Sequence, residues 1–141
     1  MCSSDLDSDN QSRLKAIVHE HGWPTAKLVG KDAVHATFLL LQHASDTNFQ
    51  KEMLPLIRRS FVNGDLDGQS YALLFDRIRV RENKPQLYGT QARPLAEWKD
   101  KTPALMPIED EANIEKRRAD LGLPPLDLYL KMMKQVYFPA K

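Results

Sequence analysis

The chain has 141 residues, of which 42% are hydrophobic and 28% are charged, and its formal net charge is +1 at pH 7. This length and composition predict one globular domain, because a chain of this size buries about two thirds of the surface that it exposes when unfolded. Basic and acidic residues are mixed without the basic stripe that binds a phosphate backbone, so no nucleic-acid partner is expected. The longest apolar run, residues 36–41, is far shorter than the roughly 20 residues that span a bilayer. We therefore expect no membrane partner and a cytoplasmic location.

The first residues are not expected to contribute to the fold. The letters CSSDL at 2–6 are what one reading frame of a sequencing adapter encodes, so residues 1–7 are predicted to be an artefactual or disordered tail, and residues 8–141 the single domain. The natural N-terminus, with any leader peptide, would then be missing. Cys2 is the only cysteine, which leaves no disulfide, thiol nucleophile or cysteine metal site to consider.

Helical patterns dominate the rest of the chain. Apolar residues recur at helical spacing in six segments: 8–20, 31–44, 46–62, 67–82, 110–121 and 126–137. Gly22 should end the first helix, and Asp46 should cap the third, which Pro55 should bend or interrupt. The helix at 31–44 is apolar on nearly every side, so we expect it at the centre of the core.

Residues 86–108 break the helical pattern. Three prolines and short extended pieces lie in this segment, and proline is excluded from the interior of a sheet. We expect a small β-hairpin or an extended insertion here. The predicted fold class is therefore mainly α, a compact bundle of about five or six helices with this insertion.

Histidine gives and takes a proton near pH 7, so the four histidines are the first candidates for acid/base catalysis. His19 lies beside Glu20 and is interpreted as a surface residue. His21 opens the sequence HGWP, where its ring either points into a cavity or caps the end of the first helix. His43 follows Gln42 on the apolar helix, so at least one of these two side chains must be buried and hydrogen-bonded.

The stretch KPQLYGTQ, residues 84–91, is a second polar cluster. Side chains alternate between two faces of an extended segment, so several of these groups should share one face. They either form the floor of a polar pocket or belong to a structural network in which the QH pair is linked to YGTQ or to Asp76. The polar members are Gln86, Tyr88, Thr90 and Gln91.

The remaining candidates are an aspartate–arginine pair, a metal site and the common motifs of nucleotide-binding proteins and serine hydrolases. Asp76 and Arg79 are one helical turn apart, where they form either an ion pair or part of a substrate site. The histidines are poorly spaced for chelation, so we expect no metal site. Nucleotide-binding and serine hydrolase motifs are missing, and no cofactor is expected.

Phrases spread along the chain resemble an uncharacterised bacterial family, a domain of unknown function. The shared phrases are HGWPT (21–25), LLLQHA (39–44), DRIRV (76–80), KPQLYGTQ (84–91), PIED (107–110) and LGLPPL (121–126). The resemblance spans nearly all of the chain after the first helix begins, and it implies a common fold and a common site without naming a reaction. Ser45 and Asn83 depart from the family pattern, which has an acidic residue and a glycine at these positions.

Two functions from different classes remain open. The first is a small histidine-dependent acid/base enzyme, a hydrolase or transferase, with His43, His21 and Tyr88 as catalytic residues and with His43 and Tyr88 close together. Its substrate-binding residues would be Gln42, Gln86, Thr90, Gln91, Asp76 and Arg79. The second is a non-catalytic ligand- or protein-binding module, in which these residues form a buried network and the loop 92–106 contacts a peptide or protein. The expected partner is a small molecule or a peptide.

Overall fold

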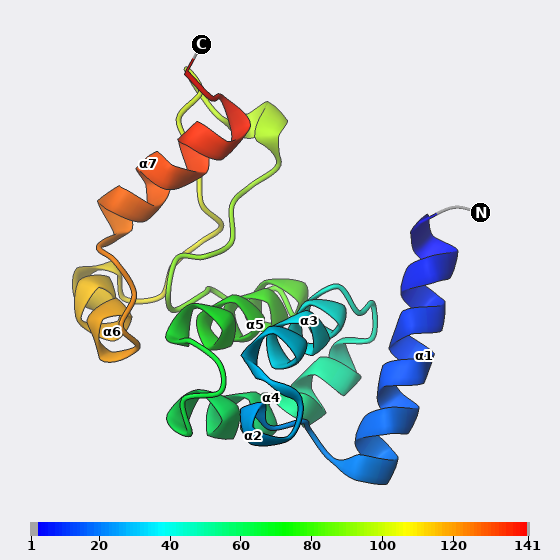
Figure 1. Ribbon diagram of the computed structural model, residues 1–141. Coiled ribbons are helices and arrows are strands. Elements are labelled where there is room, and N and C mark those ends of the chain that lie inside the picture. Colours follow the sequence, from blue (N-terminus) through cyan, green and yellow to red (C-terminus); the bar gives the residue numbers. More distant parts are fainter. Residues whose placement is uncertain (1–2, 141) are drawn as a thin grey trace. The chain divides into compact units, whose positions relative to one another are not determined.

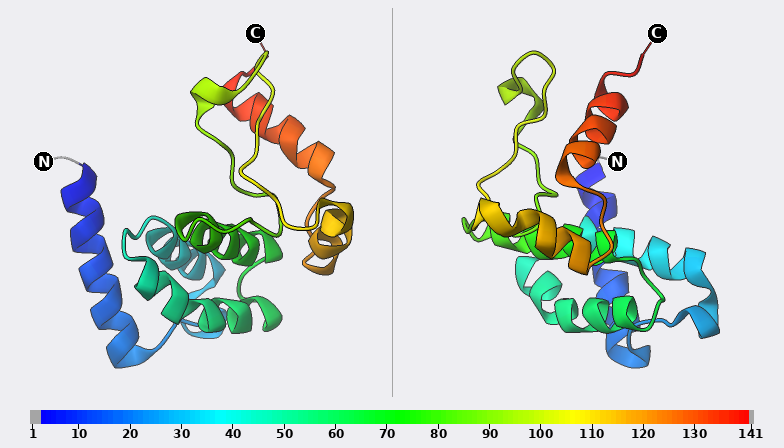
Figure 2. Two further views of the ribbon diagram at one scale, coloured as in Figure 1. Left: turned by 180° about the vertical axis from the view of Figure 1, so that it is seen from behind. Right: turned by 90° about the vertical axis from the view of Figure 1, so that its left-hand side faces the viewer.

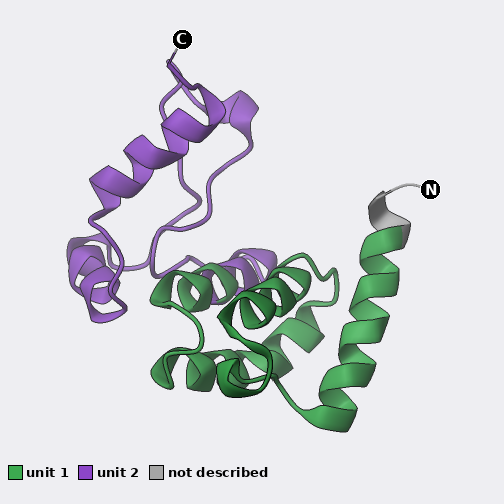
Figure 3. Ribbon diagram, in the orientation of Figure 1, with its two compact units in different colours: residues 1–74 green, residues 75–141 purple. Residues whose placement is uncertain are grey.

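The computed structural model describes residues 3–140, with side chains from residue 6, and helices account for most of them (Figure 1). Within this range there are seven α-helices, two short 3-10 helices and no sheet, which confirms the mainly α prediction. The chain forms two compact units, residues 1–74 and 75–141 (Figure 3). None of the helices in the described part is long and apolar enough to cross a membrane. The single domain predicted for residues 8–141 stays a prediction.

Four helices of the first unit lie near the predicted positions (Figure 2). A short helix at Ala26–Val29 was not predicted, so the described residues hold seven α-helices where about five or six were expected. The first of them begins five residues earlier than predicted, at Ser3, so the backbone of residues 3–7 is helical; the artefactual origin of that segment stays a prediction. The bounds are α1 (Ser3–His21), α2 (Ala26–Val29), α3 (Lys31–Gln42), α4 (Thr47–Val62) and α5 (Gly68–Arg81), and the unit boundary falls inside α5.

Local signals set the ends of these helices as the sequence predicts. Gly22 adopts a φ of +77° after the last residue of α1. Asp46 caps α4, because its Oδ1 accepts a hydrogen bond from the N–H of Phe49 at 3.1 Å. Its Oδ2 accepts a second hydrogen bond from Lys15 Nζ at 2.7 Å, which ties α1 to the start of α4. Pro55 does not interrupt α4, which continues to Val62.

The helix α3 contributes one face to the core, although its sequence is apolar on nearly every side. Val34, Phe38 and Leu41 are at most 1% exposed and lie at spacings of four and three residues. Leu39 and Leu40, on another face, are 42% and 41% exposed. The apolar run of this helix therefore includes side chains that remain partly exposed.

The second unit contains the second half of α5 and shorter elements. The helix predicted over 110–121 is divided into a 3-10 turn and a shorter α-helix, whereas the last helix is confirmed at its predicted bounds. The elements are η1 (Leu95–Glu97), η2 (Glu111–Asn113), α6 (Ile114–Asp120) and α7 (Leu126–Tyr137).

The β-hairpin predicted near residues 86–108 is not formed, and the alternative of an extended insertion describes this segment. Three isolated bridges replace a continuous ladder: Gln86 with Ile108, Ala92 with Leu105, and Lys99 with Thr102. Proline supplies no N–H to a ladder, and the 3-10 turn η1 interrupts one arm between the bridges at Ala92 and Lys99. Asn83, the position where the resemblance expects glycine, has a φ of +60°.

The Asp46 ion pair predicts a dependence of stability on pH. The hydrogen bond from Lys15 and the N–H of Phe49 lower the pKa of Asp46. Stability gained from the ionised carboxylate is therefore present at neutral pH and is lost as the pH falls from about 5 to 2. Asp46→Asn retains a good helix cap but loses the ion pair, so its melting temperature should lie below that of the parent at pH 7 and approach it in acid.

Thermal unfolding of both proteins followed by circular dichroism across this pH range measures the effect. Lys15→Gln should behave like Asp46→Asn, because it removes the same pair. A difference in melting temperature that stays constant down to pH 2 would contradict the assignment.

Candidate functional site

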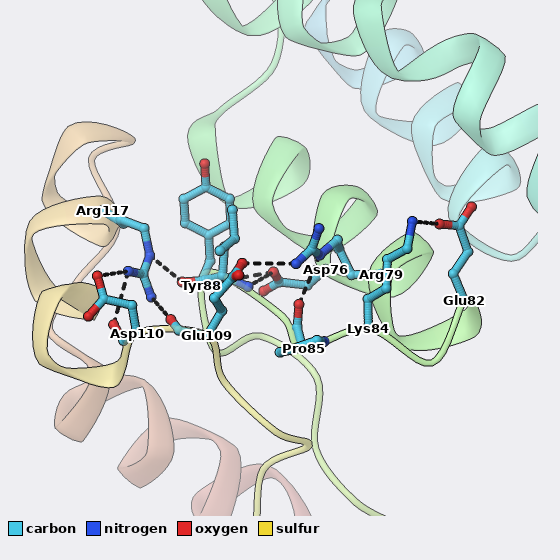
Figure 4. A network of polar contacts seen from close by, with 10 residues as sticks. Asp76, Arg79, Glu82, Lys84, Pro85, Tyr88, Glu109, Asp110 and Arg117 are labelled. Carbon is cyan, nitrogen blue, oxygen red and sulfur yellow. Dashed lines mark hydrogen bonds and ion pairs between the residues drawn. The ribbon is translucent and has the colours of Figure 1, made fainter.

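The carboxylate of Asp76, on α5, accepts four hydrogen bonds from the loop that follows this helix. Its Oδ1 accepts from the N–H groups of Leu87 and Tyr88 at 2.9 and 3.1 Å (Figure 4). Its Oδ2 accepts from the N–H of Thr90 at 3.0 Å and from the Thr90 hydroxyl at 2.8 Å. Asp76 is fully buried. The polar stretch KPQLYGTQ therefore folds around a buried carboxylate. The network expected from the sequence joined the QH pair to this stretch or to Asp76, and that link stays a prediction.

Burial and hydrogen bonding act on Asp76 in opposite directions. Removal from water raises the pKa of Asp76, and the four donors, which stabilise the charged form, oppose this rise. The loop must turn sharply to direct its amide groups to one side chain, and Gly89 has a φ of +73° at this turn. A Cβ atom at position 89 would lie 3.1 Å from Ile114 Cδ1 and 3.1 Å from Leu126 Cδ1, so a side chain would require these neighbours to shift and would be strained at this positive φ.

Gln86 joins the two arms of the same loop. Its Nε2 donates to the carbonyl oxygens of Gln91 and Met106 at 2.9 and 2.8 Å, and its Oε1 accepts from the N–H of Gln91 at 2.9 Å. The side chain is fully buried. Its amide thus performs the hydrogen bonding that a β-ladder would otherwise supply.

Two arginines bind the outer side of the loop (Figure 4). Arg117 donates from Nε to Leu87 O at 2.8 Å and from a terminal nitrogen to Glu109 O at 2.6 Å. Arg79 donates from Nε to Pro85 O at 2.8 Å and from a terminal nitrogen to Glu109 Oε2 at 2.9 Å. Arg79 therefore holds the loop and does not pair with Asp76 in these contacts.

Arg118 brings a positive charge into the interior of this unit. It is fully buried, and it donates from Nε to Pro124 O at 2.9 Å and from a terminal nitrogen to Tyr88 O at 2.6 Å. Its guanidinium carbon lies 5.0 Å from the centre of the Tyr129 ring. Burial lowers the pKa of Arg118, and the charge of Glu115 opposes this shift. The loop is thus held by a carboxylate at its N–H groups and by guanidinium groups at its carbonyls.

A groove of about 660 Å³ lies between this loop and α7. The Tyr129 hydroxyl donates to Thr90 O at 3.0 Å, which fixes α7 beside the loop (Figures 1 and 2). Trp98 packs edge-on against Tyr137, with 5.2 Å between ring centres. The apolar residues lining the groove are Leu95, Trp98, Met132, Met133, Val136 and Tyr137.

Sequence reasoning missed the contribution of α7 to this groove. A signal was present, because Leu128, Met132 and Val136 recur every four residues and are 49%, 50% and 77% exposed. An apolar stripe that stays exposed on a folded unit marks a binding surface more often than single exposed apolar residues do.

The structure gathers six of the nine predicted site residues around the loop. These are Asp76, Arg79, Gln86, Tyr88, Thr90 and Gln91. Asp76, Gln86 and Thr90 are buried and make their hydrogen bonds to the protein itself. Their role in substrate binding stays a prediction.

The other three predicted residues belong to the first unit. Gln42 is 6% exposed and donates from Nε2 to Leu73 O at 3.3 Å, which confirms that at least one member of the QH pair is buried. His43 is exposed at the end of α3, and His21 is exposed beside Glu20. His43 and Tyr88 are in different units, so their proximity stays a prediction.

Two further observations concern ionisable groups in the first unit. His19, interpreted from the sequence as a surface residue, is exposed and lines a groove of about 590 Å³ that also contains Lys15 and Asp46. Over the described residues, no group of three or more histidine, cysteine, aspartate or glutamate side chains is placed to hold a metal ion.

Comparison with known proteins identifies a family but no activity. The model of a family of unknown function, DUF6624, matches residues 1–139. This match confirms the resemblance to an uncharacterised domain of unknown function. No curated protein and no solved structure matches the chain.

The Asp76 network predicts a large loss of stability when the charge is removed. In Asp76→Asn, an NH₂ group faces hydrogen-bond donors of the loop, so buried N–H groups lose their acceptor. We expect the free energy of unfolding to fall by about 2–4 kcal/mol. Urea unfolding followed by circular dichroism measures this change.

Asp120→Asn is the control, because the side chain of Asp120 is 64% exposed and forms a surface ion pair with Lys116. This variant should change stability by less than about 0.5 kcal/mol. Equal effects of the two substitutions would show that the carboxylate of Asp76 does not hold the loop.

Proposed function

We propose that this chain, which belongs to the DUF6624 family, is a binding module for an extended apolar peptide segment. The proposal rests on the geometry of residues 75–140. The peptide would lie in the groove between the loop and α7. It would pair with the backbone at Ala92 and bury its apolar side chains against Met132, Val136 and Tyr137. The backbone edge at Ala92 is the observation that carries the proposal.

The edge at Ala92 supports a backbone-pairing mode. Gln91 O accepts from Met106 N at 3.0 Å, and Arg93 N donates to Ala104 O at 2.8 Å. Backbone groups of successive residues alternate in direction along an extended segment, so the N–H and C=O of Ala92 point away from the arm that contains Ala104. Ala92 lines the groove, and its N–H and C=O make no hydrogen bond with other described residues. An added strand would supply both partners.

The wall formed by α7 supports an apolar partner. Met132, Val136 and Tyr137 are 50%, 77% and 56% exposed, and all three line the groove. Full burial of an exposed apolar side chain contributes about 1.5–3 kcal/mol, and these partly exposed side chains would contribute a fraction of that value each. Methionine adapts its shape to different partners, which suits the recognition of a segment by its apolar character.

The charge of this unit favours a peptide with acidic flanks. Residues 75–141 contain 13 lysines and arginines against 10 aspartates and glutamates, a net charge of +3. Arg93 lines the groove, and its terminal nitrogen lies 3.8 Å from Glu97, so this ion pair is loose. Acidic residues beside the apolar segment would gain from the excess positive charge.

The acid/base enzyme has weaker support. All four histidines belong to residues 1–74 and are exposed, and no histidine lines the groove. Asp76, Gln86 and Thr90 direct their polar groups at the loop backbone. A reaction that uses His43, His21 and Tyr88 therefore stays a prediction from the sequence.

Selection from a phage library of random dodecapeptides on the full chain tests the proposal. We expect enrichment of peptides with alternating apolar residues and acidic flanks. Synthetic copies, measured by fluorescence anisotropy, should bind Val136→Asp at least tenfold more weakly than the parent. Ala92→Pro should also weaken binding, because it removes the free N–H without breaking a hydrogen bond of the fold.

Val62→Asp is the matched control, since Val62 is an equally exposed valine, at 70%, in the first unit. It should leave peptide affinity unchanged. Failure to enrich any peptide, or equal affinity for Val136→Asp and Val62→Asp, would contradict the proposal. The apolar dye 8-anilinonaphthalene-1-sulfonate distinguishes a further outcome. If the dye binds saturably at Val136 and no peptide binds, the groove is assigned to small molecules instead.

A further inference from the structure

A smaller pocket, of about 310 Å³, lies in the first unit between the HGWPT turn and α4. HGWPT is one of the phrases that carry the family resemblance, and the proposed peptide groove makes no use of it. The residues that matter for the argument are Trp23, Pro24, Leu56, Arg59, Ser60 and Asp65.

Two polar atoms of this pocket are buried without a partner. Trp23 Nε1 and Ser60 Oγ are shielded from solvent, and neither makes a hydrogen bond with any described residue. Ser60 is only 4% exposed. Buried polar groups in folded proteins are nearly always hydrogen-bonded, so two unpaired groups lining one pocket indicate a missing partner.

The chemistry of these groups defines the partner. An indole N–H can only donate a hydrogen bond, so Trp23 requires an acceptor, and a serine hydroxyl can donate to the same acceptor oxygen. Arg59 lines the same pocket, and its guanidinium makes no ion pair or hydrogen bond with other described side chains. We infer that the pocket binds the carboxylate of a small amphipathic molecule, with Trp23 and Ser60 as donors and Arg59 as the countercharge.

The size and charge of the pocket restrict which carboxylates would bind. A volume of about 310 Å³ is near the lower end of the range for ligand pockets, which suits a short-chain acid. Pro24 and Leu56 supply an apolar wall for an alkyl chain. Asp65 also lines the pocket, and its negative charge opposes a second carboxylate on the ligand. Monocarboxylates are therefore preferred to dicarboxylates.

Binding requires a small rearrangement, because both donor atoms are shielded in the ligand-free protein. A serine side chain has three staggered rotamers, and a single χ1 rotation of Ser60 moves its hydroxyl. An ordered water molecule is the alternative partner for the two donors. The experiment must therefore distinguish a carboxylate from water.

Nuclear magnetic resonance of the tryptophan indole N–H groups provides the test. The chain has two tryptophans, and a Trp98→Phe variant assigns the two signals. Titration of the ¹⁵N-labelled full chain with sodium butyrate should shift the Trp23 signal saturably and leave the Trp98 signal in place. Sodium chloride at equal ionic strength and n-butylammonium chloride should have no effect, and succinate should bind more weakly than butyrate.

Two buried serines, one of them a control, distinguish a hydroxyl that binds the ligand from a hydroxyl that stabilises the fold. Ser60→Ala should leave the melting temperature unchanged or higher, because it removes an unpaired polar group, and should weaken butyrate binding at least tenfold. Ser70 is also buried, but its Oγ donates to Asp67 Oδ1 at 2.8 Å. Ser70→Ala should lower the melting temperature by a few degrees and leave butyrate affinity unchanged.

Two results would overturn the inference. A Trp23 signal that responds to butyrate no more than to sodium chloride would assign the two donors to water alone. A Ser60→Ala variant that loses as much stability as Ser70→Ala and binds butyrate like the parent would show that Ser60 is structural. Neither result bears on the peptide groove, which is formed by residues 90–137.

Discussion

The buried carboxylate of Asp76 is the constraint on which residues 75–140 depend. A charge without water requires several donors, and a loop without a strand partner requires acceptors for its N–H groups. The loop around Tyr88 meets both requirements by folding over Asp76. This interaction fixes Thr90. The carbonyl oxygen of Thr90 accepts a hydrogen bond from the hydroxyl of Tyr129, which holds α7 against the loop. The position of the groove that we propose to bind a peptide therefore depends on one ionisable side chain.

Arginine side chains bind the carbonyl groups of the same loop. Arg117 and Arg118 donate to the carbonyls of Leu87 and Tyr88, while Asp76 accepts from the N–H groups of the same two residues. Side chains thus fix the bend at Leu87 and Tyr88, where the N–H and C=O groups all have side-chain partners. The edge without a partner lies further along the loop, at Ala92, and the proposed recognition by strand addition would use that edge.

Local features of the fold were predictable from the sequence, and features that join distant segments were not. The cap at Asp46 and the bounds of α7 follow from short-range signals. The position of Asp76 on an apolar stripe indicated burial, but its pairing with the loop was not predicted, because the sequence pointed to Arg79 as its partner. The hairpin was wrong because alternation of side chains does not reveal whether a second strand or a glutamine such as Gln86 satisfies the backbone. The groove and the Trp23 pocket each combine residues from separate elements, which spacing along the chain cannot bring together.

Amide hydrogen exchange at Leu87, Tyr88 and Thr90 tests the central claim most directly. These three N–H groups lie in a loop, where exchange is ordinarily fast, and their protection here depends on the carboxylate of Asp76. The account predicts that all three exchange as slowly as the amides in the middle of α5, and that they lose this protection together when Asp76 is replaced by asparagine. Exchange of the three amides in the parent protein at the rate of an open loop would contradict it.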